Sequence, residues 1–300
     1  MAIQQELWIN EIQDNLYKGL EAIKIAATDD SAFVNGKTIH IPTAGAATAI
    51  TKGNSTYPVT VSERTDSDNS YDLTNFEFGP YRIGWAEQQQ LTYDKQKSII
   101  NDLTGGLGER MARELMISWY HYTAGKYVGT SGSAYAAHAT GATSNRKGLT
   151  GADLRRAAAI LDTQKIAMDN RFLLVDNTMF WQLMDDLEYN AERVGALGNG
   201  LQTAPGTPYG FTVIAMPAVV YATSAGVVRA YGNAGTTTDQ AVALALHKSA
   251  ASWAFTDVDV MNDDNNPAYF GSLVSGTAWG GGKYRRADKL GIVPIIQVNA

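Results

Sequence analysis

The amino-acid sequence predicts an α+β fold, and three observations lead to this class. From Ser98 to Tyr122, apolar residues recur every three or four positions, which is the spacing of one long amphipathic helix. From Tyr57 to Ile83, apolar and polar residues alternate on both sides of an acidic, turn-rich run, which predicts a long β-hairpin. From Thr150 onward, helical and strand patterns alternate, as in a sheet flanked by helices.

The composition of the chain limits the classes of protein to which it can belong. A chain of 300 residues with 45% hydrophobic content can bury a sizeable core in one large or two compact units. The absence of cysteine excludes disulfides and thiolate metal sites. A net charge of −6 argues against a dedicated nucleic-acid binder, because phosphate affinity depends on clustered Lys and Arg. We find neither a secretory signal nor an apolar run of about 18 residues, so we expect a cytoplasmic protein without a membrane span.

The first thirty residues predict a helical arm. Their apolar positions follow three- and four-residue steps at Leu7, Ile9, Ile12, Leu16, Leu20 and Ile23. Such a stripe needs a partner surface. A short hairpin is then expected over Phe33–Pro42, with Asn35 and Gly36 forming a tight turn.

The long hairpin is the most distinctive predicted element. Tyr57, Val59 and Val61 share one face, and a return strand carries further apolar residues. A two-stranded ribbon of this length is not stable alone in water, so we expect its apolar face to lie on another subunit. The subunit-interface candidates are Tyr57, Val59, Val61, Leu73, Phe76 and Phe78 in the hairpin, with Trp8 and Leu16 in the arm.

Glycine-rich segments predict where helices and strands are interrupted. Gly105, Gly106 and Gly108 each cost a helix up to about 1 kcal/mol relative to Ala, so we expect a bend or a two-part helix there. The low-periodicity run 124–147 is expected to be a surface connection and a domain boundary. The run Gly280–Lys283 lacks phosphate-loop spacing and is interpreted as a turn, like 124–126.

A second unit is expected after this connection. Thr150 and Asp153 have the spacing of a capping box at the start of a helix. Asp176 or Asn177 is expected to cap a second helix, which carries Leu187 near its end. The strands that these helices flank are predicted at Phe172–Val175, Phe211–Ile214 and Val242–Leu246, and a closing strand is predicted at Ile292–Ile296 in the last 50 residues.

The sequence contains no catalytic or metal-binding pattern, so we expect no enzyme, no cofactor and no metal. The histidines at 40, 121, 138 and 247 lie in four different predicted elements without metal-ligand spacing. The acidic run Asp66–Asp72 lacks the glycine and glutamate of a calcium loop and is interpreted as a solvated hairpin tip. A weak cation site at a subunit junction stays open for the cluster Asp257, Asp259, Asp263 and Asp264.

The order of these elements, together with the segments Glu6–Ile9, Phe33–Gly45 and Ser62–Ser67, resembles the major capsid proteins of tailed double-stranded DNA bacteriophages. The short segments look like coat proteins of phages that infect Bacteroidetes. The resemblance covers nearly the whole chain and implies the Hong-Kong-97-type fold, with an N-terminal arm, an extended hairpin loop, a long spine helix, a peripheral domain and an axial domain. It implies no enzymatic turnover.

On this resemblance the chain divides as follows: 1–32 the arm, 33–92 the N-terminal hairpin and extended loop, 93–148 the peripheral domain with its spine helix, 149–250 the axial domain, and 251–300 a return to the peripheral domain. The resemblance implies self-assembly into hexamers and pentamers of an icosahedral or prolate head in the virion, after synthesis in the host cytoplasm. Further implied partners are a portal protein, scaffolding and decoration proteins, and packaged double-stranded DNA contacted non-specifically, with no membrane.

Two alternatives remain open at this point. An encapsulin-like bacterial nanocompartment shell has the same fold and differs in what it encloses. A hydrolase would need Asp257, Asp259 and a histidine to converge in the folded chain, although no spacing supports this.

Overall fold

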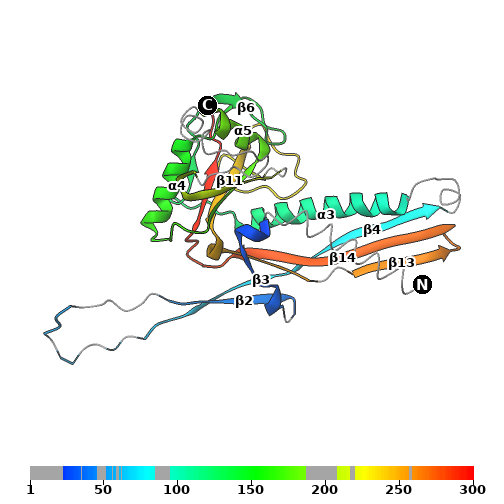
Figure 1. Ribbon diagram of the computed structural model, residues 1–300, viewed down its shortest axis with the longest axis horizontal. Coiled ribbons are helices and arrows are strands. Elements are labelled where there is room, and N and C mark those ends of the chain that lie inside the picture. Colours follow the sequence, from blue (N-terminus) through cyan, green and yellow to red (C-terminus); the bar gives the residue numbers. More distant parts are fainter. Residues whose placement is uncertain are drawn as a thin grey trace.

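The computed structural model describes residues 23–34, 36–45, 52–55, 57–58, 61, 63–84, 95–186, 208–216, 220–256 and 259–300. Within these residues the chain forms a five-stranded sheet, a six-stranded sheet and two two-stranded ribbons. Figure 1 shows the six-stranded unit with its helices at the top, and helix α3 running beside the long strands β4, β14 and β13 below it. The ribbon β2–β3 extends in the opposite direction.

The helices are α3 (Lys95–Trp119), α4 (Gly151–Thr163) and α5 (Asn177–Asp185), with short 3-10 turns η1 (Ser31–Phe33), η2 (Pro208–Gly210) and η3 (Lys248–Ala250). The strands before α4 are β1 (Thr28–Asp29), β2 (Thr38–Thr43), β3 (Ser67–Asp72), β4 (Thr74–Gly84), β5 (Val128–Gly129), β6 (Ala134–Ala136) and β7 (Asn145–Lys147). The later strands are β8 (Arg171–Asp176), β9 (Phe211–Met216), β10 (Val220–Ala222), β11 (Gln240–His247), β12 (Ala251–Phe255), β13 (Asp259–Asn266), β14 (Gly271–Tyr284) and β15 (Ile292–Ile296).

The five-stranded sheet is built around the long strand β14, which pairs with β12, β13 and β4. Gly280–Lys283 lies inside this strand, so the predicted turn there is wrong. The glycines are needed because α3 lies directly on the strand. A Cβ atom built on Gly282 would stand 2.6 Å from Leu115 Cδ2 and 3.2 Å from Trp119 Nε1. The turn expected at 124–126 is present.

Helix α3 is continuous through Gly105, Gly106 and Gly108, so the two-part helix expected there is wrong. Its apolar stripe supplies Leu107, Met111, Leu115 and Trp119 to the largest buried cluster. Burial of each large apolar side chain stabilises by about 1.5–3 kcal/mol, which outweighs the cost of the glycines.

The six-stranded sheet has both faces covered, which explains its continuous apolar strands. Along β11, Val242, Leu244 and Leu246 join the cluster shared with α3, whereas Ala241, Ala243 and Ala245 join the cluster under α4 and α5. The three strands predicted for this unit, at 172–175, 211–214 and 242–246, are confirmed, and the closing strand at Ile292–Ile296 is present as β15. However, β15 pairs with β11, so the last strand does not return to the five-stranded sheet as expected for 251–300.

The two caps of this unit are also confirmed. The Thr150 side chain accepts from the Asp153 N–H, and the Asp153 carboxylate accepts in turn from the Thr150 N–H, forming a capping box at α4. Asp176 caps α5 by accepting from the Met179 N–H at 2.7 Å. Leu187, expected on this helix, lies outside the described residues.

The hairpin differs from its prediction. Strand β2 pairs antiparallel with β3, from Thr38 opposite Asp72 to Thr43 opposite Ser67. The short hairpin over 33–42 is therefore wrong, and the acidic run is a strand rather than a tip. Neither Tyr57 nor Val61 is in a strand. The observed register is favoured because it gathers Ile39, Ile41 and Tyr71 of the two strands in one buried cluster, which also contains Leu73 and Ala254.

Candidate assembly surface

The base of the hairpin is fixed to the end of β14 by side-chain hydrogen bonds. Asn69, which is buried, donates its Nδ2 to the Tyr284 carbonyl at 2.7 Å. Lys283 Nζ donates to the Ser70 carbonyl at 2.8 Å. These bonds join the ribbon to the five-stranded sheet and set the direction in which it projects.

A buried ion pair adds to this base. Asp30 is 3% exposed, and Arg285 Nη1 donates to its Oδ1 at 2.8 Å. Thr43, the last residue of β2, donates its Oγ1 to the Arg285 carbonyl at 3.3 Å. Arg285 thus connects the two features, because its side chain forms the ion pair with Asp30 and its carbonyl accepts from Thr43 at the end of β2.

Beyond this base the chain between β2 and β3 is called here the hairpin loop, residues 44–66. Apart from Gly45, every described residue of the loop is exposed. Tyr57 is 76% and Val61 is 90% exposed. Large apolar side chains at a projecting tip favour burial against a partner, at about 25 cal/mol per Å² of covered apolar surface.

The remaining interface candidates have other surroundings. Leu73 is 2% exposed and packs with Ile39 and Ala254 of its own chain, so the expectation that it needs a neighbouring subunit is corrected. Phe76 and Phe78 are partly buried against the main core of the same chain. Three candidates lie outside the described residues: Trp8, Leu16 and Val59.

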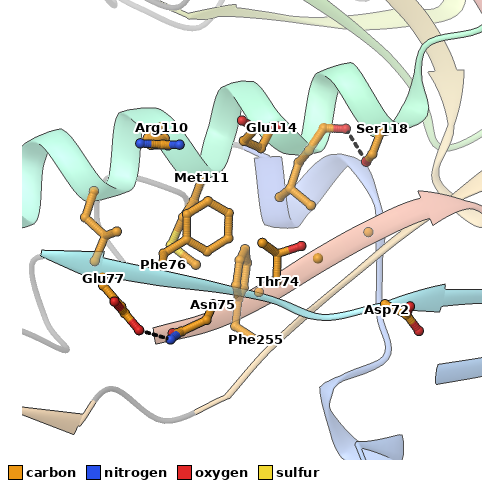
Figure 2. A pocket seen from close by; sticks show the side chains of 15 residues that line it. Asp72, Thr74, Asn75, Phe76, Glu77, Arg110, Met111, Glu114, Ser118 and Phe255 are labelled. Carbon is orange, nitrogen blue, oxygen red and sulfur yellow. Dashed lines mark hydrogen bonds between the residues drawn. The ribbon is translucent and has the colours of Figure 1, made fainter. Parts of the chain in front are cut away.

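A groove of about 480 Å³ lies between α3, β4 and the glycine-containing end of β14. Figure 2 shows α3 on one side of it and β4 on the other, with Phe76, Met111 and Phe255 between them. Further lining residues are Asp72, Thr74, Asn75, Glu77, Leu107, Arg110, Glu114, Leu115, Ser118 and Gly280–Gly282. No sequence pattern predicted this groove. The run of glycines opposite an amphipathic helix was the available signal.

Carboxylates outnumber cations around the groove. Asp72 and Glu77 both accept side-chain hydrogen bonds, from Thr38 and Asn75. Glu114 has no hydrogen bond or ion pair with any described residue. The guanidinium of Arg110, the single cation of the described lining, lies 4.9 Å from the centre of the Tyr231 ring. The rim therefore carries uncompensated negative charge.

The histidines are not brought together. Their hydrogen-bond partners are Asp68 for His40, the Ile292 carbonyl for His121, Asp176 for His138 and Ser249 for His247. No group of three or more His, Asp or Glu side chains in the described part of the chain could hold a metal ion. Asp257 lies outside that part, and no described histidine hydrogen-bonds Asp259 or Asp263. The hydrolase alternative gains no support from this geometry.

Burial distinguishes His121 from the other histidines. It is 3% exposed, and its Nε2 lies 2.9 Å from the Ile292 carbonyl, which accepts from the neutral ring. Burial lowers the pKa of His121 below its ordinary value, and the hydrogen bond to Ile292 opposes this only in part.

No helix in the described ranges is long and apolar enough to cross a membrane.

The two packed sheets, the long helix and the projecting hairpin define a shell-forming structural protein of the Hong-Kong-97 type. A family model for phage capsid proteins matches residues 81–245, more than half of the chain. The chain belongs to this phage capsid protein family. It is accordingly a major capsid protein that forms the viral shell, and the family places it in the virion. No curated protein sequence matches the chain.

Solved structures agree with this fold. The capsid of Ralstonia phage GP4 is similar, with a TM-score of 0.63 and 11% identity over 92% of this chain and 87% of that chain. The head of the Helicobacter pylori bacteriophage KHP40 has a TM-score of 0.62 and 13% identity over 90% and 86%. A virus-like particle from Pyrococcus furiosus has a TM-score of 0.54 and 10% identity over 97% and 99%.

Proposed function

We propose that the shell is built by the hairpin loop of each subunit lying across an adjacent subunit, within hexamers and pentamers of an icosahedral or prolate head. The exposure of Tyr57 and Val61 on a hairpin whose base is fixed carries this proposal. A fixed base matters because a projecting loop can reach a neighbour reproducibly only if its direction is set by its own subunit.

The other parts of the chain have roles in the same assembly. Residues 149–250, together with β5 and β15 of the same six-stranded sheet, act as the axial domain around the symmetry axes, and α3 with β12, β13 and β14 acts as part of the peripheral domain. The arm over 1–32 contributes further contacts through Trp8 and Leu16. The protein has no catalytic turnover. It assembles in the host cytoplasm with a portal protein and with scaffolding or decoration proteins, and it encloses double-stranded DNA.

The double variant Tyr57→Ser, Val61→Ser tests this function. Both positions are exposed in the subunit, so the variant should fold like the natural chain. We expect it to elute as capsomers or free subunits and to show no shells by electron microscopy. Val227→Ser is the matched control, because Val227 is 63% exposed but lies outside the hairpin, and it should form normal shells. Normal shells from the double variant would overturn the proposal.

A nanocompartment shell is the second candidate, because the chain is also similar, over 97% of its length, to a virus-like particle that is named after a cellular organism rather than a phage. The two kinds of shell differ in what they enclose. Particles isolated from the natural source should contain nuclease-protected double-stranded DNA. Particles that hold a protein cargo and no DNA would favour the nanocompartment instead.

A further inference from the structure

Directional contacts join helix α3 to the six-stranded unit at two places along the helix. One is the end of α3, where the Tyr120 hydroxyl donates to the Gly226 carbonyl at 3.0 Å. The other is farther back, at Arg110 and Arg113. Ten residues separate Arg110 from Tyr120, which is about 15 Å of helix at 1.5 Å per residue. Apolar packing between α3 and β11 also holds the units together, but the hydrophobic effect has no direction. Two directional contacts this far apart can fix an angle.

The second place consists of two arginines on one aromatic ring. The guanidinium carbon atoms of Arg110 and Arg113 lie 4.9 Å and 5.1 Å from the centre of the Tyr231 ring. Both distances are within the about 6 Å at which a cation is attracted to the face of a ring. Neither guanidinium forms an ion pair with a described residue, although Glu114 and Glu109 stand four positions away, a spacing at which helical ion pairs form. The arginines are thus directed to Tyr231, and the three residues are called here the arginine–tyrosine clamp.

Tyr231 lies in the loop between β10 and β11, which is fixed to the six-stranded unit on both sides of the tyrosine. Arg229 donates to the buried Asp239 carboxylate at 3.0 Å and 3.1 Å. Tyr221, in β10, donates its hydroxyl to the Asn233 carbonyl at 2.6 Å. Because its neighbours are held in this way, Tyr231 moves with the six-stranded unit, whereas the two arginines move with α3.

We propose that the arginine–tyrosine clamp sets the angle between the six-stranded unit and α3, and through this angle the curvature of the shell. A closed shell repeats one subunit many times, so a change in the shape of that subunit is repeated in every copy. A small difference in angle therefore changes the diameter at which the shell closes. This inference goes beyond the proposed function, because it concerns the shape of the subunit and not the contact made by its hairpin loop.

The clamp can be removed without opening a cavity in the core. Tyr231 is partly exposed and belongs to none of the buried apolar clusters. Its hydroxyl forms no hydrogen bond with a described residue, so Tyr231→Phe keeps the ring and both cation contacts. Tyr231→Ser loses them. Both variants should unfold close to the denaturant concentration of the natural chain, which makes them a matched pair.

Shell diameter, measured by electron microscopy, is the first readout. In Tyr231→Ser the width of the diameter distribution should increase about twofold or more, because subunits with different angles coexist. Tyr231→Phe should form shells of the natural diameter. Unchanged diameters in Tyr231→Ser, or equal changes in both variants, would overturn the proposal.

The arginines give an independent version of the same test. Arg110→Gln, Arg113→Gln should broaden the diameters as Tyr231→Ser does. Arg155→Gln is the control, because Arg155 is exposed on α4 and has no ion pair with a described residue, and its shells should keep the natural diameter. Equal broadening in this control would show that the loss of positive charge, and not the clamp, changes the shell.

The angle itself is the second readout, and it does not require assembly. The cysteine-free chain allows spin labels at Met168→Cys, between α4 and β8, and at Met261→Cys in β13, since both side chains are exposed. In unassembled full-length subunits, pulsed electron paramagnetic resonance should give a distance distribution about twofold wider for Tyr231→Ser than for Tyr231→Phe or the natural residue.

Equal widths in all three proteins would overturn the clamp. If Tyr231→Ser forms no shells, the distance distribution decides alone: a wider one supports the clamp and an unchanged one overturns it. Failure of the proposed function has a different result, because Tyr57→Ser, Val61→Ser would then form normal shells whatever the clamp variants do.

Discussion

Trp119 donates its indole N–H to the Ser252 carbonyl at 2.9 Å, and the side chain is completely buried. The bond joins the last residue of α3 to β12, beneath which Gly282 leaves space for the ring. Helix and sheet are therefore locked together at this end. The groove beside α3 lies on the same two elements, so its shape depends on this contact.

Trp119→Ala should reduce the free energy of unfolding of the subunit by about 3–5 kcal/mol, because it removes a large buried side chain and leaves a cavity. Chemical denaturation of unassembled subunits, followed by circular dichroism, measures this. Trp181→Ala is the control, since Trp181 is 65% exposed, and it should change stability by less than about 1 kcal/mol. Equal losses in both variants would contradict the assignment of Trp119 to the core.

Leu73→Ala and Val61→Ala should separate stability from assembly. Leu73 is buried, so its truncation should cost about 2–5 kcal/mol of unfolding free energy. Val61→Ala should leave that free energy within about 0.5 kcal/mol, yet lower the yield of shells. The two are compared by denaturation and by electron microscopy of the same preparations. A destabilised Val61→Ala subunit would show that the loop packs on its own chain.

Arg285→Met should destabilise the base of the hairpin, because it leaves the Asp30 carboxylate buried without its cation. Arg285 is itself partly exposed, so we expect a loss of about 2–4 kcal/mol, less than for a fully buried pair. Limited proteolysis should then cut near residues 43–67 faster than in the natural chain. Arg286→Met breaks only the exposed pair with Asp288 and should cost less than about 1 kcal/mol.

Stability should fall as the pH is lowered from about 7.5 to 5, in part through His121. Its folded-state pKa is below the ordinary value of 6.5, so in this range the unfolded chain binds more protons than the folded chain. Burial lowers the pKa of His247 in the same direction. His121→Gln should therefore have a shallower pH dependence than the natural chain, measured by denaturation at several pH values. An unchanged slope would show that His121 does not contribute.

The sequence was sufficient to predict an element wherever a short local pattern determines that element. The capping box at Thr150, the Asp176 cap and the buried strand Phe172–Val175 follow from short patterns that no distant contact overrides. The long helix was found by its periodicity, but its continuity was not, because the packing of Met111 and Leu115 on β14 decides it.

The pairing of strands that lie far apart in the chain could not be predicted from the sequence alone. β2 and β3 pair across the intervening hairpin loop, whereas Asn35-Gly36 suggested a local turn. The same limit explains the interface candidates. Alternation indicated that Leu73 and Val61 are both apolar positions of a hairpin, but only the strand register places Leu73 inside and leaves Val61 in solvent.

An electron cryomicroscopy map of the assembled shell tests the central claim most directly. We expect density for residues 44–66 of each subunit to lie against the adjacent subunit, with Tyr57 and Val61 covered. A map in which the loop stands free in solvent, while the shell is closed by other surfaces, would contradict the account.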